Sequence, residues 1–283
     1  MKYCWFEAGG SPLYGEIEER DGEFWVVALL SSPMALHGRP ATEADESAAF
    51  EPRRLSELSL LPPVAPSKII CVGRNYRDHA KELGNEVPAE PLLFFKPPSS
   101  LLPPGGIIRM PAASQRVDFE GELAVIIGKR ARRLHRDQDL REYIHGYTLA
   151  NDVTARDLQK KDGQWTRAKG FDTFCPVGPL IETDLDPAAG LILETRVNGE
   201  LRQHGSTADF LFTLPILLEY ITAAMTLEPG DLLLTGTPAG VGPLAPGDTV
   251  EVSLPGLGKL TNTVQPEEGW PSALNHPLQG LSS

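Results

Sequence analysis

Only one segment of this sequence has the length and periodicity of a substantial amphipathic helix, and this scarcity constrains the fold more than any other feature. That segment is TADFLFTLPILLEYITAAMTL, residues 207–227, in which Pro215 is expected to mark a kink or a boundary. Elsewhere short apolar runs alternate with turn residues, as in LILETRVNGELRQ, where Asn198-Gly199 predicts a hairpin. We therefore predict a mostly β protein of the α+β type with few helices.

A proline-rich connection divides the chain. The segment LLPPVAPSK, residues 60–68, predicts an extended linker, because each proline fixes its own φ and disfavours helix at the residue before it. Alternating pieces such as EFWVVALL predict a small β-rich N-terminal domain over residues 1–62. Residues 63–283 are expected to form the larger second domain, with a short helix in NYRDHAKELGNEVPAE (75–90).

Composition and charge exclude several classes of protein. A chain of 283 residues with 41% hydrophobic residues can bury a sizeable core. Its net charge of −12 argues against a nucleic-acid partner. No signal peptide or bilayer-spanning run is found, so we expect no membrane partner and a cytoplasmic location. Cys4, Cys71 and Cys175 are odd in number and widely spaced, which favours reduced structural thiols.

Two glutamates stand at the head of an apolar run in DFEGELAVIIGK, residues 118–129. Side chains alternate along a strand, so Glu120 and Glu122 are expected on one face about 7 Å apart. Buried unpaired carboxylates cost several kcal/mol, roughly, so the pair must be solvated, protonated, matched by cations or bridged by a metal ion. An exposed face paired with Arg116 or Arg130 is the alternative.

A metal at these carboxylates would be a hard cation. Neither Cys nor His is near Glu120 and Glu122 in sequence, which favours Mg²⁺, Mn²⁺ or Ca²⁺ over zinc and copper. A third oxygen ligand is needed, and Asp152 is the natural candidate because it follows the apolar strand YTLA. Three carboxylates would leave positions free for water or substrate.

His79 and Glu82 lie three residues apart in DHAKE, so a helical turn would place them on one face. A carboxylate beside a histidine favours the imidazolium and orients the ring, as a general base requires. A solvated surface turn is the alternative interpretation of so polar a stretch.

Six motifs occur in order along the chain: GRNYRDHAKE, LFFKP, DFEGELAVIIGK, GYTLANDVTARDLQ, AKGFDTFCPVGP and LLLTGTPAGVGP. Together, from about residue 68 to 264, they resemble the fumarylacetoacetate hydrolase family. The resemblance implies a mixed β-roll, a divalent metal, usually magnesium, and a homodimer. It also implies chemistry on C–C bonds next to the carbonyl of small anionic 2-oxo or 1,3-diketo acids.

The resemblance also implies roles for individual residues. Asp152 matches the third metal carboxylate, while His79 and Glu82 match a base and its partner on a segment that can act as a lid. Arg156, Gln159 and Lys169 match positions that stabilise an oxyanion, with salt bridging on a mixed-charge loop as the alternative.

Four further residues are candidates for substrate binding. Tyr76 and Lys96 are predicted either to hold the distal end of the substrate or to be structural. In TGTPAGVG, Gly236 lets the backbone approach an anion and Thr237 can donate its hydroxyl to a substrate carboxylate, with a plain tight turn as the alternative.

The expected activity is hydrolysis of an acylpyruvate-like or fumarylacetoacetate-like substrate, since Arg156, Gln159 and Lys169 suit an oxyanion. The alternatives are an oxaloacetate decarboxylase and an isomerase of 5-carboxymethyl-2-hydroxymuconate or 2-hydroxyhepta-2,4-diene-1,7-dioate. A non-catalytic protein that binds a metal or a small acid is the least favoured hypothesis, because it would be expected to lose the His79 and Glu82 pair or one metal carboxylate.

Overall fold

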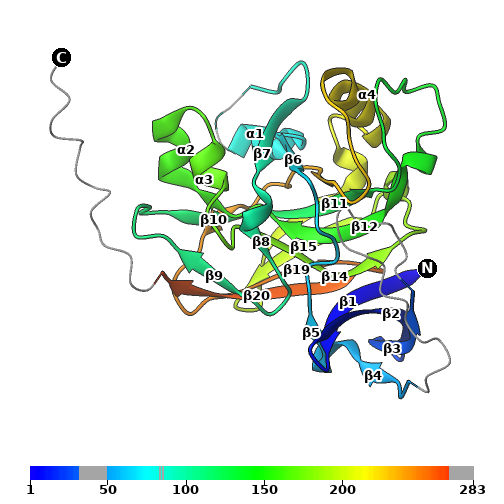
Figure 1. The fold of residues 1–283 in the computed structure, drawn as a ribbon. Helices are drawn as coiled ribbons and strands as arrows, with labels where there is room; N and C mark the ends of the chain where they lie inside the picture. Colours follow the sequence, from blue (N-terminus) through cyan, green and yellow to red (C-terminus); the bar gives the residue numbers. More distant parts are fainter. Residues whose placement is uncertain (32–49, 83, 85, 268–283) are drawn as a thin grey trace, which may run out of the picture.

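The structure is a computed structural model and describes residues 1–31, 50–82, 84 and 86–267. Strands dominate these residues. Figure 1 shows the strands stacked in layers, with short helices along one side. The α-helices are α1 (Arg77–Glu82), α2 (Arg156–Asp162), α3 (Thr166–Lys169) and α4 (Leu214–Ala224). The prediction of a mostly β fold with few helices is confirmed.

The largest sheet has twelve strands and is mixed. Most neighbours are antiparallel, but β17 runs parallel to β6 and β14 parallel to β8. In spatial order its strands are β4 (Arg53–Arg54), β3 (Glu23–Leu30), β2 (Ser11–Arg20), β1 (Lys2–Ala8), β14 (Cys175–Glu182), β12 (Ile144–Asn151), β11 (Gly121–Ile127), β17 (Leu232–Leu234), β6 (Ile69–Gly73) and β7 (Leu92–Lys96), with β5 (Ser59–Leu60) on β1 and β8 (Leu101–Leu102) on β14.

Two smaller sheets complete the fold. The five-stranded sheet contains, in order, β16 (Glu200–Ser206), β15 (Ile192–Val197), β19 (Thr249–Leu254), β20 (Gly258–Pro266) and β9 (Ile107–Met110). The three-stranded sheet contains β13 (Thr154–Ala155), β10 (Val117–Phe119) and β18 (Gly242–Pro243). The five-stranded sheet packs against β11, β12 and β14, and Leu123 and Val252 belong to the apolar core between these layers.

The predicted hairpin is confirmed. Strands β15 and β16 pair from Val197 and Glu200 onward, and the two residues between them, Asn198 and Gly199, have φ of 52° and 83°. Positive φ at both central positions is the requirement of a type I′ turn, which is why Asn-Gly suits this connection.

The N-terminal strands continue the main sheet. Strand β1 pairs antiparallel with β14, with Lys2 opposite Glu182 and Tyr3 opposite Ile181. The expected boundary between residues 62 and 63 stays a prediction.

Both predicted helices form, and both are shorter than their sequence segments. A 3₁₀ turn occupies Thr207–Asp209, and α4 begins only at Leu214 with Pro215 in its first turn, so this proline marks a boundary. Helix α1 is followed by Gly84 with φ of 68°, and Leu83 and Asn85 lie outside the described residues. Within the described ranges, no helix is long and apolar enough to cross a membrane.

The three cysteines are buried and none is disulfide-bonded. Burial raises the pKa of Cys4 and of Cys175 to about 12. Such thiols carry almost no thiolate at neutral pH, which fits the structural role predicted for them.

Candidate active site

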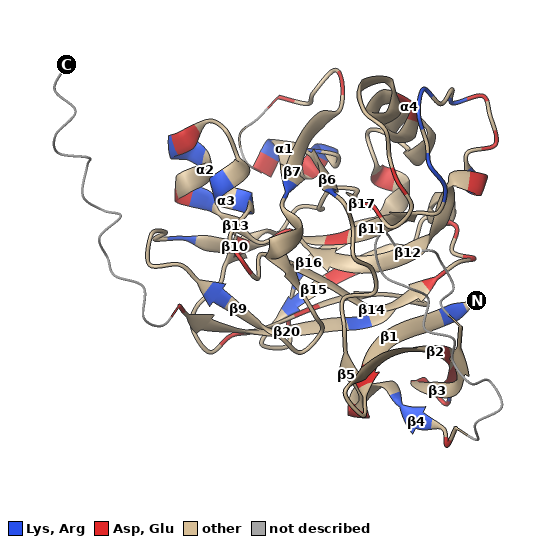
Figure 2. Ribbon diagram, viewed as in Figure 1, with Lys and Arg blue, Asp and Glu red and all other residues tan. Residues whose placement is uncertain are grey.

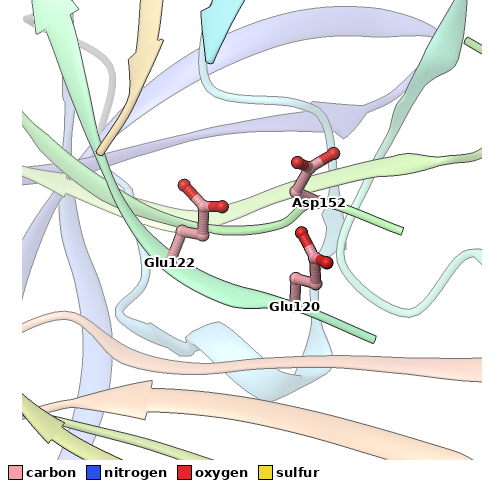
Figure 3. Close-up of side chains that lie close together, drawn as sticks. All are labelled: Glu120, Glu122 and Asp152. Carbon is pink, nitrogen blue, oxygen red and sulfur yellow. The ribbon is translucent and has the colours of Figure 1, made fainter. Parts of the chain in front are cut away.

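Strand pairing brings the three predicted metal carboxylates together. Gly121 lies opposite Asn151 in the β11–β12 pair, so Glu120 and Asp152 extend side by side from the ends of the two strands. The backbone N–H of Asp152 donates to the carbonyl oxygen of Glu120 at 2.8 Å. Each of Glu120, Glu122 and Asp152 offers a carboxylate oxygen within 4.8 Å of the others, and all three side chains are buried (Figure 3).

Gly121, between the two glutamates, is held from two directions. Its N–H donates to the side-chain oxygen of Gln203 at 2.9 Å, and its carbonyl accepts from the Thr237 hydroxyl at 2.8 Å. Gln203 also donates to the Thr237 hydroxyl at 2.7 Å. A Cβ at Gly121 would lie 2.1 Å from the hydroxyl oxygen of Thr195, so no side chain fits there. Sequence reasoning missed Gln203, which lies on another sheet.

Buried cations match two of the three carboxylates. The Nζ of Lys169 lies 2.7 Å from Glu120 Oε2 and 2.5 Å from Asp152 Oδ2, and the Nζ of Lys96 lies 2.6 Å from Asp152 Oδ1. Glu122 differs, because its contact among the described residues is the backbone N–H of Gly236 at 2.6 Å. Its carboxylate therefore has no cationic partner at ion-pair distance in the described structure.

The two glutamates of the strand consequently have opposite pKa shifts. Burial alone would raise the pKa of Glu120, but Lys169 and Arg156 outweigh it and hold that pKa well below its usual range. Burial, together with the charges of Asp152 and Glu120, raises the pKa of Glu122 well above its usual value. The site can therefore gain from one more positive charge, and the place for it is beside Glu122.

These observations fit a divalent metal ion. The donor set consists of three buried carboxylates, and within the described residues the group contains neither a cysteine nor a histidine. Oxygen donors alone suit Mg²⁺, Mn²⁺ or Ca²⁺. Glu120, Glu122 and Asp152 would hold such an ion.

Arg156, the first residue of α2, is engaged at all three of its nitrogens. Its Nε lies 2.9 Å from Asp118 Oδ2, its Nη2 lies 2.5 Å from Glu120 Oε1, and its Nη1 donates to Gln159 at 2.8 Å. Figure 2 shows Lys and Arg gathered on α2 and α3, which contact β13 beside this end of the sheet. The salt bridges proposed as the alternative for Arg156 are present, Asp118 was missed from the sequence, and a role toward substrate stays a prediction.

His79 and Glu82 face each other on α1, as their spacing predicted, with Nδ1 3.4 Å from Oε2. Glu82 also accepts the backbone N–H of Gly240 at 3.0 and 3.2 Å, which ties α1 to the loop after β17. Burial lowers the pKa of His79, although Glu120 and Glu82 oppose this shift. The neutral imidazole is thus favoured, whereas the sequence alone suggested the imidazolium, because burial outweighs the carboxylates.

A small cavity of about 60 Å³ opens above the carboxylates. Its lining includes Glu120, Glu122, Asp152, His79, Arg156, Gln159, Lys169 and Thr237.

The other predicted site residues lie behind this lining. Lys96 is fully buried against Asp152, and Tyr76 packs edge-on against Phe210 with ring centroids 5.2 Å apart. Gly236 has φ of 100° and contributes its N–H to Glu122. For Tyr76 and Lys96, this geometry favours the structural alternative over direct substrate contact.

Comparison with known proteins supports the resemblance to the fumarylacetoacetate hydrolase family over most of the chain. The family model for the fumarylacetoacetate (FAA) hydrolase C-terminal domain matches residues 68–265. Oxaloacetate tautomerase YisK of Bacillus subtilis is 43% identical over 224 residues, which cover 74% of this chain and 74% of that protein. The mitochondrial oxaloacetate decarboxylase of Dictyostelium discoideum is 47% identical over 199 residues, covering 67% of this chain and 89% of that protein.

A solved structure extends the similarity to the fold. The crystal structure of 5-carboxymethyl-2-hydroxymuconate delta-isomerase from Mycobacterium smegmatis superposes with a TM-score of 0.81 at 39% identity. The match covers 94% of this chain and 100% of the isomerase. Ordered motifs, carboxylate geometry and fold agree, and the chain belongs to the fumarylacetoacetate hydrolase family.

Proposed function

We propose that this enzyme forms the enolate of a small 2-oxo acid with the help of a divalent metal ion, either by removal of a proton from the carbon next to the carbonyl, which gives keto–enol isomerisation, or by loss of CO2 from that carbon followed by its protonation, which gives decarboxylation. The observation that carries the proposal is that His79 is buried and lines the same cavity as the three carboxylates, where burial lowers its pKa. Proton transfer at carbon needs a base of this kind close to the group that stabilises the enolate.

A divalent ion held by Glu120, Glu122 and Asp152 would supply positive charge for the oxygen on which the enolate charge develops. The protein supplies the proton transfer. The Nδ1 of His79 faces Glu82, which leaves Nε2 to take a proton from the carbon next to the substrate carbonyl. Glu82 holds the ring in this orientation and is itself fixed by the N–H of Gly240.

Two observations support isomerisation or decarboxylation over hydrolysis. Three of the five N–H groups of Arg156 donate to Asp118, Glu120 and Gln159, and the buried carboxylates of Asp118 and Glu120 already match its charge, which weakens its case as the main partner for the oxyanion of an attacked carbonyl. In addition, the relatives described above are named for oxaloacetate tautomerisation, oxaloacetate decarboxylation and hydroxymuconate isomerisation. None of these reactions requires water to attack a carbonyl.

Hydrolysis of an acylpyruvate-like substrate remains a second candidate, favoured by Gln159 and Lys169 at the cavity wall. The deciding measurement is kcat/KM with Mg²⁺ for oxaloacetate, acetylpyruvate and a hydroxymuconate-type diacid. We expect oxaloacetate or the diacid to be preferred. Preference for acetylpyruvate, together with a loss of about 100-fold or more for that substrate alone in Lys169→Met, would establish hydrolysis instead.

The role of His79 is tested by His79→Ala. We expect kcat to fall about 10²- to 10⁴-fold while oxalate, a stable two-oxygen chelator that resembles the enolate, still binds in the presence of Mg²⁺. Equal losses of oxalate binding and turnover would show that His79 is structural. Full activity after exhaustive EDTA treatment and gel filtration would disprove the metal requirement.

A further inference from the structure

One cationic side chain at the cavity has no counter-charge. Arg74 lines the same cavity as Arg156 and Lys169. Those two are held by buried carboxylates, whereas the Arg74 guanidinium makes no hydrogen bond or ion pair with any residue that the structure describes. A partly buried, unpaired guanidinium beside a cavity is a ready partner for an anion.

The backbone at Arg74 is unusual as well. Its φ of 57° lies in the left-handed region, which residues with a Cβ disfavour and glycine adopts easily. An arginine kept in this conformation next to a ligand cavity suggests that its side chain has a function there.

The neighbouring residues hold Arg74 in place. Asn75 is fully buried, donates to the carbonyl of Thr235 at 2.8 Å, and accepts the N–H of Phe212 at 2.8 Å. On the other side, a Cβ on Gly73 would lie 3.1 Å from the ring of Trp165. The backbone is thus constrained on both sides of Arg74, so the fold sets the position of its Cα at the cavity.

Aromatic rings close the same part of the cavity. Trp165 packs edge-on against Phe94 with ring centroids 5.1 Å apart, and both line the cavity with Arg74. This wall and the small cavity volume favour a compact substrate.

We propose that Arg74 binds the distal carboxylate of the substrate, so that the enzyme is specific for compact 2-oxo dicarboxylates. This inference rests on the proposed function, in which the 2-oxo carboxylate end lies at Glu120, Glu122 and Asp152. Without Arg74, a second substrate carboxylate would have no unpaired cation in the cavity, because Arg156 and Lys169 are already paired with buried carboxylates. The planar guanidinium can hold it with two parallel hydrogen bonds.

The test compares two ligands that differ only at the distal group. Oxaloacetate carries a carboxylate where 2-oxobutyrate carries a methyl group. Equilibrium binding of both is measured by calorimetry with Mg²⁺ in the His79→Ala background, where turnover is expected to be slow, with residue 74 as Arg, with Arg74→Gln, and with the control Arg77→Gln, whose arginine is exposed on α1. We expect Arg74→Gln to weaken oxaloacetate binding about 10- to 100-fold and to leave 2-oxobutyrate within about threefold, as expected for loss of a charged hydrogen-bond pair. Arg77→Gln should change neither.

Arg74→Gly is a second variant that is expected to stay folded, because glycine suits the left-handed backbone at this position and should preserve Tm. It should show the same selective loss of oxaloacetate binding. Equal weakening of both ligands, or no weakening, would overturn the inference about Arg74.

Turnover separates this inference from the proposed function. Enolisation is followed as exchange of the C3 protons of each ligand into D₂O. If wild type binds oxaloacetate through Arg74 but accelerates no exchange, decarboxylation or hydrolysis, the proposed function is wrong while the dicarboxylate site stands. If exchange occurs and Arg74→Gln lowers kcat/KM equally for both ligands, the function stands and the dicarboxylate site is wrong.

Discussion

Ion pairs occur at two distant places beside the main sheet, the candidate site and the β1–β14 seam. The two sets of ion pairs differ in how deeply their cations are buried. At the candidate site, Glu120, Asp152 and Lys169 are almost fully buried. At the β1–β14 seam, Glu182 pairs with Lys2 at 2.7 Å and with the N-terminal amine at 3.2 Å, and both cations reach solvent. The first cluster surrounds a cavity, whereas the second joins the N-terminal strands to the sheet.

The comparison teaches that buried charge here serves the site more than stability. Removing several charges from water is costly, and buried pairs repay that cost only with good geometry, so they are weak evidence of stabilisation. The N-terminal seam pairs the buried Glu182 with cations that still reach solvent, so it has less of this cost and a correspondingly small gain. The four predictions that follow separate the two regions, from the largest expected effect to the smallest.

Lys169→Met should lower the free energy of unfolding by about 3 kcal/mol, because it leaves Glu120 and Asp152 with less compensation in a buried setting. Lys96 and Arg156 remain, which keeps the loss at the lower end of the range for a broken buried pair. Urea denaturation measures it. Lys259→Met, which breaks an exposed pair with Glu251, is the control and should leave stability unchanged. Equal effects of the two substitutions would erase the contrast between buried and exposed charge.

Glu122→Gln should weaken Mn²⁺ or Mg²⁺ binding more than about 100-fold, beyond what is typical for residues that only support a ligand. Without metal, the same substitution should leave stability unchanged or raise it, because it removes a buried carboxylate that has no cationic partner in the described structure. Calorimetry and urea denaturation give the two values. Glu182→Gln is the matched control for metal binding, and comparable loss of affinity in both would refute the assignment of Glu122 as a ligand.

Glu182→Gln should cost about 1 kcal/mol at pH 7, the scale of a hydrogen bond at a partly solvated pair. Burial alone would raise the pKa of Glu182, but hydrogen bonds from Lys2, Asp184 and the N-terminus hold it below its ordinary value. The stabilisation is therefore complete above the unfolded-state pKa of about 4.3 and disappears as the pH falls through the folded-state pKa. A difference between wild type and variant that grows on acidification would contradict this sign.

Asp184→Asn should have the smallest effect. Asp184 contacts the N-terminal amine at 2.8 Å, but its side chain is 82% exposed. We expect no measurable change in Tm in 0.5 M NaCl and little at low salt, since exposed pairs are screened. A clear loss of stability at both salt concentrations would show that this seam depends on charge more than its exposure suggests.

Local sequence signals predicted a large part of the fold. The alternation of side chains put Glu120 and Glu122 on one face, Asn198-Gly199 gave the hairpin turn, and Pro215 marked a helix boundary. Each of these depends on residues within a few positions of one another, which is why single-sequence patterns suffice.

Contacts over long sequence separations could not be predicted in this way. Gln203 fixes Gly121 from 82 positions along the chain, and β1 pairs with β14 from across most of it. The cation partners are a similar case: Lys96 was a candidate, but nothing in LFFKP indicates that its ammonium group lies on Asp152. The lowered pKa of His79 was also beyond local reasoning, because it depends on how much of the fold covers α1.

The close packing around Gly121 has a consequence for altering this enzyme by directed evolution. Even alanine there would meet the Thr195 hydroxyl at 2.1 Å, unless the two packed layers move apart. Mutational libraries should therefore leave codon 121 fixed and diversify the cavity lining instead, where Arg74, Gln159 and Trp165 offer variation in size and charge. New substrate preferences are expected to arise at the cavity lining, while position 121 has no room for a side chain.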